Sequence, residues 1–109
     1  MTELPAAVLR YQDAHDRRDA DGALATFTPD ALVTDDGHTY SGHVEIRDWL
    51  SRASVEFTYT RTLIDVAQVD DSTWLVTNHL EGDFPGGVVD LRYRFVVSGE
   101  LLSKLDIAP

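Results

Sequence analysis

The first third of the chain has the periodicity of amphipathic helices. Leu4, Val8, Tyr11 and His15 recur at steps of four, three and four, so they share one face of a helix. Thr2 can cap this helix, because a side-chain hydroxyl accepts hydrogen bonds from the free backbone amides of a first turn. We therefore expect a first helix that turns this face toward the core.

A second, short helix is expected after the break in "RRDAD". Asp19 or Asp21 caps it, and Ala23, Leu24 and Phe27 face inward. The "TPD" that follows is a stop signal, because proline and its polar neighbours end helices. Two helices are thus predicted before the first strand.

The first strand is expected over residues 31–36. Successive side chains of a strand point to opposite faces, so Val33 and Asp35 share one face and Asp36 lies on the other. A turn follows at the glycine of "DDGH", and a short strand then runs through Tyr40. The stretch thus predicts Asp35 as an inward-facing carboxylate at the end of a strand.

The remainder of the chain predicts one more helix and then only strands. A third helix opens at Gly42, with an apolar stripe formed by Ile46, Trp49, Leu50 and Ala53. Strands rich in β-branched and aromatic residues are expected from Val55 onward, over residues 55–69, 73–81, 88–97 and 100–107. This order predicts an α+β fold, with the helices packed on one face of an antiparallel sheet.

Composition limits the partners and the compartment. The 109 residues suit one domain, and 9 basic against 19 acidic residues give a formal net charge of −10. Such a surface repels phosphate backbones and anionic lipids, so we expect neither a nucleic-acid nor a membrane partner. The sequence has no cysteine and its start has no long apolar run. We therefore expect a soluble, cytoplasmic single domain over residues 1–109.

Metal, nucleotide and nucleophile chemistry have little support in the sequence. The four histidines, His15, His38, His43 and His79, show no paired ligand spacing, and Asp35 with His38 is a weak metal pair. There is no Gly-x-Ser-x-Gly motif, phosphate loop or dinucleotide fingerprint. We expect no metal and no cofactor.

The segment "YQDAHDRRDADGALATFTPDALVTDDGHTYSGHVEIRDWL" carries a family resemblance. It resembles the cone-shaped α+β domains of nuclear transport factor 2, ketosteroid isomerase and the SnoaL-type polyketide cyclases. The matching positions are Tyr11, Arg18-Asp19, Phe27, Asp30-Ala31, Tyr40-Ser41-Gly42 and Ile46-Arg47. The resemblance implies three N-terminal helices on a strongly bent antiparallel or mixed sheet that forms a conical pocket, usually in a homodimer.

The isomerases of this family imply roles for two residues of the chain. Aligned without a gap, their carboxylate base falls on Asp35 and their oxyanion-hole tyrosine on Tyr11. Their second donor falls on Leu91, and the nearest acid, Asp90, points the opposite way. His79 is a substitute donor whose facing the sequence leaves open, because Thr77-His79-Glu81 and Val76-Asn78-Leu80 both suit the inner face.

The other candidate residues divide into ligand-binding and structural positions. The expected ligand-binding side chains are His15, Trp49, Tyr59, His79 and Tyr93, and Phe57 and Phe95 are further core or pocket-wall aromatics. Asp36 and His38 are expected in the turn, Tyr40 in packing against the third helix, and Asp19 as a helix cap.

Two functions follow from these expectations. The first is the binding of a compact apolar or aromatic small molecule, with proton-transfer isomerisation or cyclisation of a carbonyl compound by Asp35 and Tyr11. The alternative is a non-catalytic homodimeric binding or assembly module whose pocket is filled by side chains.

Overall fold

The computed structural model describes residues 3–56 and 58–109, with the side chains of residues 53–56 left out of the description. Three helices and six strands lie in these ranges. In chain order they are α1 (Ala6–Asp16), α2 (Ala20–Leu24), β1 (Phe27–Asp35), β2 (His38–Ser41), α3 (Gly42–Glu56), β3 (Tyr59–Asp70), β4 (Thr73–Gly82), β5 (Val88–Ser98) and β6 (Leu101–Ala108).

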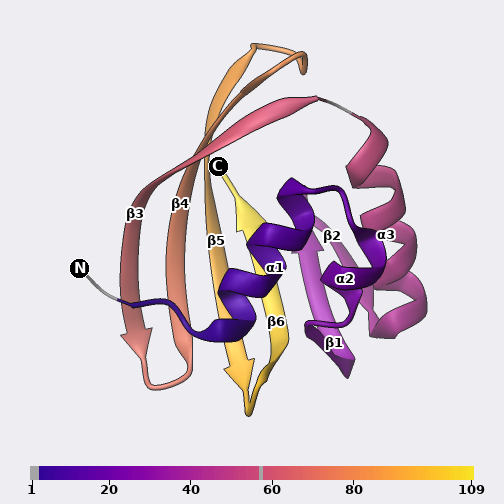
Figure 1. The fold of residues 1–109 in the computed structure, drawn as a ribbon, viewed down its shortest axis with the longest axis vertical. Helices are drawn as coiled ribbons and strands as arrows, with labels where there is room; N and C mark the ends of the chain where they lie inside the picture. The colour runs from indigo at the N-terminus through magenta and orange to yellow at the C-terminus, as the bar shows by residue number, and fades with distance from the viewer. Residues whose placement is uncertain (1–2, 57) are drawn as a thin grey trace.

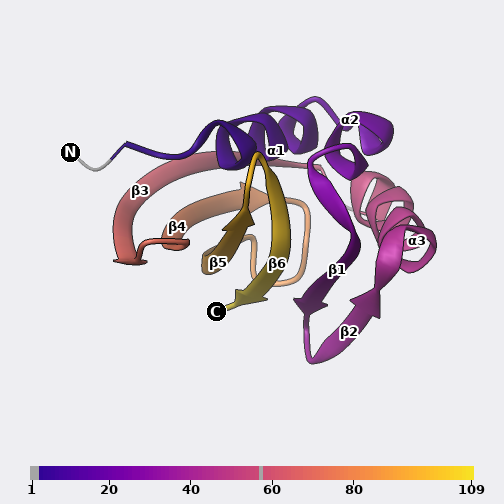
Figure 2. The same cartoon turned by 90° about the horizontal axis from the view of Figure 1, so that it is seen from below.

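The six strands form a single curled sheet in the order β2-β1-β6-β5-β4-β3. Only the β1–β6 pair is parallel among these neighbours, so the sheet is mixed. Register shifts in β3 and between Val96 and Val97 of β5 bend the strands, as bulges do. Figures 1 and 2 show the sheet curving around α1, with α3 beside β1 and β2. This confirms the predicted α+β fold with helices on a strongly bent sheet.

The beginning of α1 differs from the prediction. The helix starts at Ala6, and Pro5 occupies the N-cap position without a side-chain cap. Thr2 lies outside the described residues, and Glu3 to Pro5 are not helical, so a cap at Thr2 is wrong. Proline fixes its own φ without donating a hydrogen bond, and it starts the helix here. Asp19 does cap α2, because its Oδ1 accepts from the Gly22 backbone amide at 2.9 Å.

Two strands begin elsewhere than expected. α3 continues to Glu56 and β3 begins at Tyr59, so the strand predicted from Val55 starts too early. The helical context outweighs the low helix propensity of a β-branched residue. β1 already begins at Phe27, where its pairing with β6 is irregular and tolerates a proline. Ala53 and Phe57 fall outside the described side chains.

The core lies between the concave face of the sheet and the helices. Its fully buried side chains come from both layers: Val8, Tyr11, Phe27, Val33, Ile46, Leu50, Val76, Phe95, Leu102 and Leu105. Inner positions of neighbouring strands are in register, as Val33 pairs with Leu105 and Leu105 with Phe95. This register extends to the end of β1 and places Asp35 beside the core.

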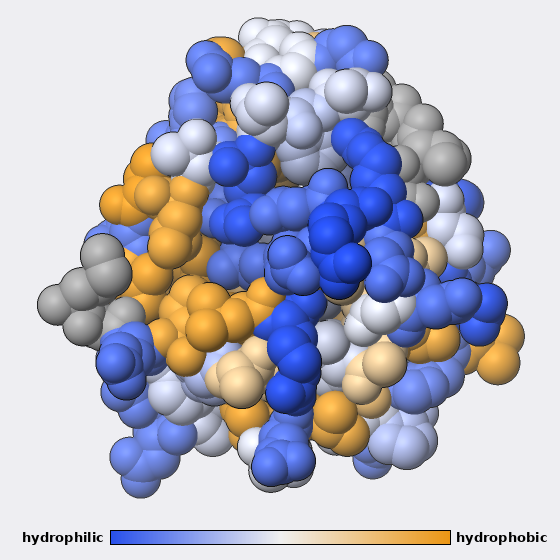
Figure 3. All heavy atoms as spheres, in the orientation of Figure 1, coloured by the Kyte–Doolittle hydropathy of each residue, from blue (hydrophilic) through white to orange (hydrophobic). Residues whose placement is uncertain are grey.

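The outer surface is mixed in character. Figure 3 shows hydrophilic side chains over the middle of the face in view and hydrophobic ones toward the side of β3 and the start of α1. Leu9 and Leu63 are among the exposed large apolar residues. Within the described part of the chain, no helix is long and apolar enough to cross a membrane.

Candidate functional site

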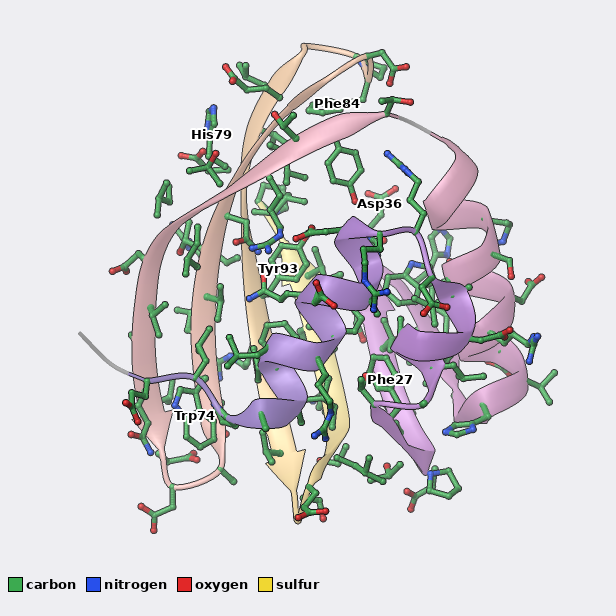
Figure 4. The ribbon with its side chains drawn as sticks, in the orientation of Figure 1. Phe27, Asp36, Trp74, His79, Phe84 and Tyr93 are labelled. Atoms are coloured by element: carbon green, nitrogen blue, oxygen red, sulfur yellow. The ribbon has the colours of Figure 1, made fainter. Side chains whose placement is uncertain are left out.

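A cavity of about 410 Å³ remains inside the curled sheet. Side chains from both helical and sheet layers surround it: His15, Asp35, Asp36, Trp49, Tyr59, Leu80, Phe84, Pro85, Val89, Leu91, Tyr93, Ile107, Ala108 and Pro109. Figure 4 shows three of them, with Phe84 at one end of the sheet and Asp36 and Tyr93 further in. The wall is mostly apolar, with a few polar groups, as is usual in ligand pockets.

Asp35 reaches this cavity through the register of three strands. It pairs with Ile107 of β6, and Ile107 pairs with Tyr93 of β5, so the three side chains share the concave face. The indole Nε1–H of Trp49, from α3, donates to Asp35 Oδ2 at 3.0 Å. Trp49 in turn stacks on Tyr40, as expected for a packing residue. One carboxylate oxygen is therefore held in place from the helical side.

Asp36 also lines the cavity, although the alternation of β1 placed it on the other face. Its φ of 53° puts it in the left-handed region of the turn, where the strand alternation no longer applies. Asp36 is exposed, whereas Asp35 is half-buried. The cavity wall thus carries two adjacent carboxylates in different environments.

Tyr11 lies behind the cavity wall. Its side chain is 1% exposed and packs edge-on against Phe27 and Phe95, with ring centroids at 5.6 Å in both cases. The hydroxyl is buried and has no hydrogen-bond partner among the described residues. Burial raises the pKa of Tyr11 well above its ordinary value, and nearby Tyr93, Tyr59 and Asp35 raise it further. The hydroxyl therefore stays protonated, close to the polar groups of the cavity.

His15 and Tyr59 form a polar pair on the wall between α1 and β3. His15 Nε2 and the Tyr59 hydroxyl are 2.5 Å apart, and the tautomer of the imidazole decides which of them donates. Burial lowers the pKa of His15 and raises that of Tyr59, so both are neutral near pH 7. The Arg18 guanidinium lies 5.5 Å from the centre of the Tyr59 ring.

Tyr93 is the third tyrosine near Asp35. It is 4% exposed, lines the cavity and stacks on Phe95. Burial raises its pKa, so its hydroxyl remains a hydrogen-bond donor at all physiological pH values. No hydrogen bond to this hydroxyl is found within the described ranges. It is available to a ligand.

His79 does not line the cavity, which corrects its placement as a ligand-binding residue there. Val76, Asn78 and Leu80 take the inner face of β4, so His79 points outward. Its Nδ1 lies 2.6 Å from Asp90 Oδ1 on the neighbouring strand, and Figure 4 shows it away from Tyr93 and Asp36. Hydrogen bonding to Asp90 raises the pKa of His79. Leu91, by contrast, is a wall residue.

A partly buried polar network joins α1 to the sheet. Arg61 of β3 binds both carboxylate oxygens of Asp16, at 2.8 and 2.6 Å, and also donates to Gln12 Oε1 at 2.8 Å and Asn78 Oδ1 at 3.0 Å. The Asn78 amide donates to Gln12 at 3.1 Å. Since Gln12 and Asp16 flank His15 on α1, this network sets the position of the helix that carries Tyr11 and His15.

Sequence reasoning missed part of the wall. Phe84 and Pro85 come from the loop between β4 and β5, which the sequence indicates only as a hairpin loop. The Phe84 ring packs edge-on against Tyr59, at 6.5 Å between centroids. A phenylalanine and a proline inside a glycine-rich loop are the signal that could have indicated a wall residue.

The arrangement suits proton transfer. A carboxylate and a tyrosine hydroxyl, those of Asp35 and Tyr93, line a mostly apolar cavity. In such an environment a carboxylate can accept a proton and a hydroxyl can stabilise a developing oxyanion. Among the described residues, no group of three or more histidine, aspartate or glutamate side chains is arranged to hold a metal ion.

Comparison with known proteins places this site in a family. The SnoaL-like domain model matches residues 8–98. A proposed polyketide cyclase from Sinorhizobium meliloti shares 34% identity with the chain at a TM-score of 0.89, covering 96% of this chain and 95% of that one. No curated protein matches the sequence.

More distant solved structures share the fold. A ketosteroid isomerase-like protein from Catenulispora acidiphila in complex with trimethylamine has a TM-score of 0.84 and 16% identity, covering 98% of this chain and 87% of that chain. A Mycobacterium tuberculosis protein in complex with estradiol-17β-hemisuccinate has a TM-score of 0.78 and 15% identity, covering 94% and 90%. The match of the family model to residues 8–98 and the 34% identity with the Sinorhizobium meliloti protein establish that the chain belongs to the SnoaL-like domain family.

Proposed function

We propose that this protein binds a compact carbonyl compound in the cavity and catalyses a proton-transfer isomerisation or cyclisation. The observation that carries the proposal is Asp35, a carboxylate at the cavity wall whose Oδ2 is held by the Trp49 indole. The ligands bound by the distant structural relatives, estradiol hemisuccinate and trimethylamine, support a small-molecule role for a cavity of this kind.

The proposed reaction begins with Asp35 as general base. A carboxylate oxygen takes a proton from the carbon between the carbonyl and a neighbouring C=C bond. The electron pair of the broken C–H bond forms a new C=C bond, and the π pair of the carbonyl group moves onto its oxygen. The protonated Asp35 then returns the proton to the far carbon of this dienolate, and the C=O bond forms again, so the double bond has moved into conjugation. A general base in the right position contributes about 10²–10⁴-fold to such a step.

The enolate oxygen needs hydrogen-bond donors. We propose Tyr93 as the donor at the cavity wall, because its hydroxyl is protonated and without a partner among the described residues. Tyr11 is the second donor in this proposal. Its side chain lies behind the cavity wall, and its buried hydroxyl without a partner among the described residues supports that role. Tyr93 lies on the same strand as Leu91, two positions on, and compensates for the missing acid there.

The test is turnover of a panel of enolisable ketones by the wild type and by Asp35→Asn. Asparagine keeps the shape and still accepts from Trp49, but it is not a base. We expect the variant to lose about 10²–10⁴-fold in kcat with little change in the melting temperature. Unchanged turnover would remove Asp35 from the mechanism.

A non-catalytic binding module is the second candidate, and one observation favours it. Leu91 is a wall residue, and the resemblance to the isomerases aligns it with their second, acidic donor. Removing one oxyanion donor costs roughly 2.7–4 kcal/mol of transition-state stabilisation. In this case ketones bind in the cavity and dissociate unchanged. The version in which side chains fill the pocket has less support, since a cavity of about 410 Å³ remains.

We further propose that the protein is a homodimer and is cytoplasmic. The family resemblance supports the dimer, and the exposed apolar side chains of Leu32, Ile64 and Val88 on the sheet are consistent with a covered surface. The absence of cysteine supports a reducing compartment.

A further inference from the structure

The charges on the cavity wall are all of one sign. Asp35 and Asp36 are both wall residues, and no arginine or lysine is among the wall residues that the structure describes. Two cations act on His15 and Tyr59 from outside this wall. Arg61 of β3 is bound to Asp16, and the Arg18 guanidinium lies 5.5 Å from the centre of the Tyr59 ring. His15 carries no charge near pH 7, since burial lowers its pKa. An anionic ligand would therefore meet repulsion in the cavity, and the net charge of −10 adds to it.

Aromatic rings surround the same space. Trp49, Tyr59, Phe84 and Tyr93 come from α3, β3, the β4–β5 loop and β5, and all four line the cavity. The face of an aromatic ring attracts a cation, and this attraction grows when the cation is removed from water. Rings on several sides together with carboxylates are the usual environment of a protein-bound alkylammonium group.

The Tyr93 hydroxyl indicates a second feature of the ligand. It belongs to a side chain that is 4% exposed, lines the cavity and has no hydrogen-bond partner among the described residues. A hydroxyl at the cavity wall with no protein partner can donate to a ligand, so a ligand that supplies an acceptor there gains a hydrogen bond. A carbonyl oxygen is such an acceptor.

We propose that the ligand of this cavity is a carbonyl compound that carries a protonated or quaternary amine. The ammonium group lies against Asp36 and the aromatic rings, and the carbonyl oxygen accepts from Tyr93. Asp36 is the exposed carboxylate and makes no hydrogen bond or ion pair with the described residues, whereas Asp35 is held by Trp49. This assignment rests on the proposed function. In it Asp35 remains the general base, which takes a proton from the carbon between the carbonyl group and the ammonium group.

The test compares two ligands of the same shape and different charge. Phenacyltrimethylammonium and neopentyl phenyl ketone differ only in a positively charged nitrogen that replaces a quaternary carbon. Calorimetric titration of the wild type at low salt should give a dissociation constant at least about tenfold lower for the cation. The advantage should shrink as salt is added, because salt screens the carboxylates.

Two variants show which charge is responsible. Asp36→Asn removes the charge and suits the left-handed backbone at this position, since asparagine adopts it readily. Asp71→Asn makes the same change of net charge in the exposed β3–β4 turn, away from the cavity. We expect the preference for the cation to disappear in Asp36→Asn and to persist in Asp71→Asn.

Different results would overturn the inference alone or the inference together with the proposed function. If the neutral ketone binds as well as the cation, or the preference survives in Asp36→Asn, the inference is wrong and the proposed carbonyl chemistry stands. If neither compound binds, both the inference and the proposed function are overturned. A circular-dichroism spectrum of Asp36→Asn that matches the wild type shows that the variant is folded.

Discussion

Two tyrosine hydroxyls near Asp35 have unused hydrogen-bonding capacity. The hydroxyl of Tyr11 is fully buried without a partner among the described residues, and the hydroxyl of Tyr93, at the cavity wall, has no hydrogen bond there either. A buried hydroxyl without a partner costs about 1–3 kcal/mol, and this cost applies to Tyr11. The ligand that we propose would supply an acceptor beside these hydroxyls.

The variant Tyr11→Phe tests whether the Tyr11 hydroxyl contributes to the free energy of unfolding or to turnover. The variant deletes an unpaired buried hydroxyl and keeps the ring contacts with Phe27 and Phe95. We expect the free energy of unfolding in urea to stay the same or to rise by about 1 kcal/mol, while turnover falls. A clear loss of stability would mean that the hydroxyl has a structural partner, and unchanged turnover would remove Tyr11 from the oxyanion site.

His15 and His79 should contribute opposite pH dependences to the free energy of unfolding. Burial lowers the pKa of His15 below its ordinary 6.5, so the unfolded chain binds the proton first as the pH falls. His15 therefore costs stability below about pH 6.5. Asp90 raises the pKa of His79, so its contribution is fully present below pH 6.5 and is lost as the pH rises through the higher folded value.

Urea titrations between pH 5 and pH 8 measure both contributions. Relative to the wild type, His15→Gln should lose less stability on acidification, and His79→Gln should lose more. Glutamine retains a polar group for Tyr59 in the first case. The same pH dependence in all three proteins would contradict both assignments.

At the scale of elements, α1 is held by polar contacts as well as by apolar packing. Asn78 is 0% exposed and bridges Gln12 of α1 and Arg61 of β3. Replacing it leaves buried groups of both partners with fewer hydrogen bonds. The network sets the height of α1 above the sheet and thereby the distance of Tyr11 and His15 from the cavity.

Asn78→Ala should therefore lower the free energy of unfolding by about 2 kcal/mol. Thr77→Ala is the matched control, because Thr77 is the neighbouring residue on the outer face of β4 and belongs to no part of this network. We expect the control to cost less than half as much in the same urea titration. Equal costs would mean that the network does not stabilise the packing of α1.

Local pattern predicts the elements better than it predicts their ends. Alternation alone places Val33 and Asp35 on one face, and the structure agrees. The end of α3 was missed because Val55 has strand propensity, and tertiary context overrides propensity. The sequence leaves the facing of His79 open, because the polar Asn78 interrupts the apolar set of Val76 and Leu80 that the structure buries.

The contacts of the site depend on the tertiary fold. The Trp49–Asp35 hydrogen bond and the His15–Tyr59 pair join elements whose distance no periodicity encodes. Phe84 lines the cavity because the loop after β4 brings its ring against Tyr59 of β3. The family resemblance indicates Tyr11 and Asp35 as a pair, and the sequence predicts Tyr93 as a ligand-binding residue, whereas the structure adds Asp36 as a cavity-wall group.

At the scale of the whole molecule, the homodimer remains a prediction. Sedimentation equilibrium at micromolar concentration should give twice the monomer mass of 12.1 kDa. The predicted interface includes the exposed apolar side chains of the sheet, so Ile64→Lys should shift the equilibrium toward monomer. A monomeric mass for the wild type would contradict the dimer and leave the cavity chemistry unaffected.

The measurement that tests the central claim most directly is deuterium exchange into a neutral ketone. The ketone is incubated in D₂O with the wild type, Asp35→Asn or Asp71→Asn, and deuterium next to the carbonyl is followed by NMR. Proton abstraction by Asp35 predicts rapid exchange with the wild type and Asp71→Asn, and a loss of about 10²-fold or more with Asp35→Asn. Exchange that persists in Asp35→Asn, or that is absent from the wild type, would contradict the assignment of Asp35 as the base.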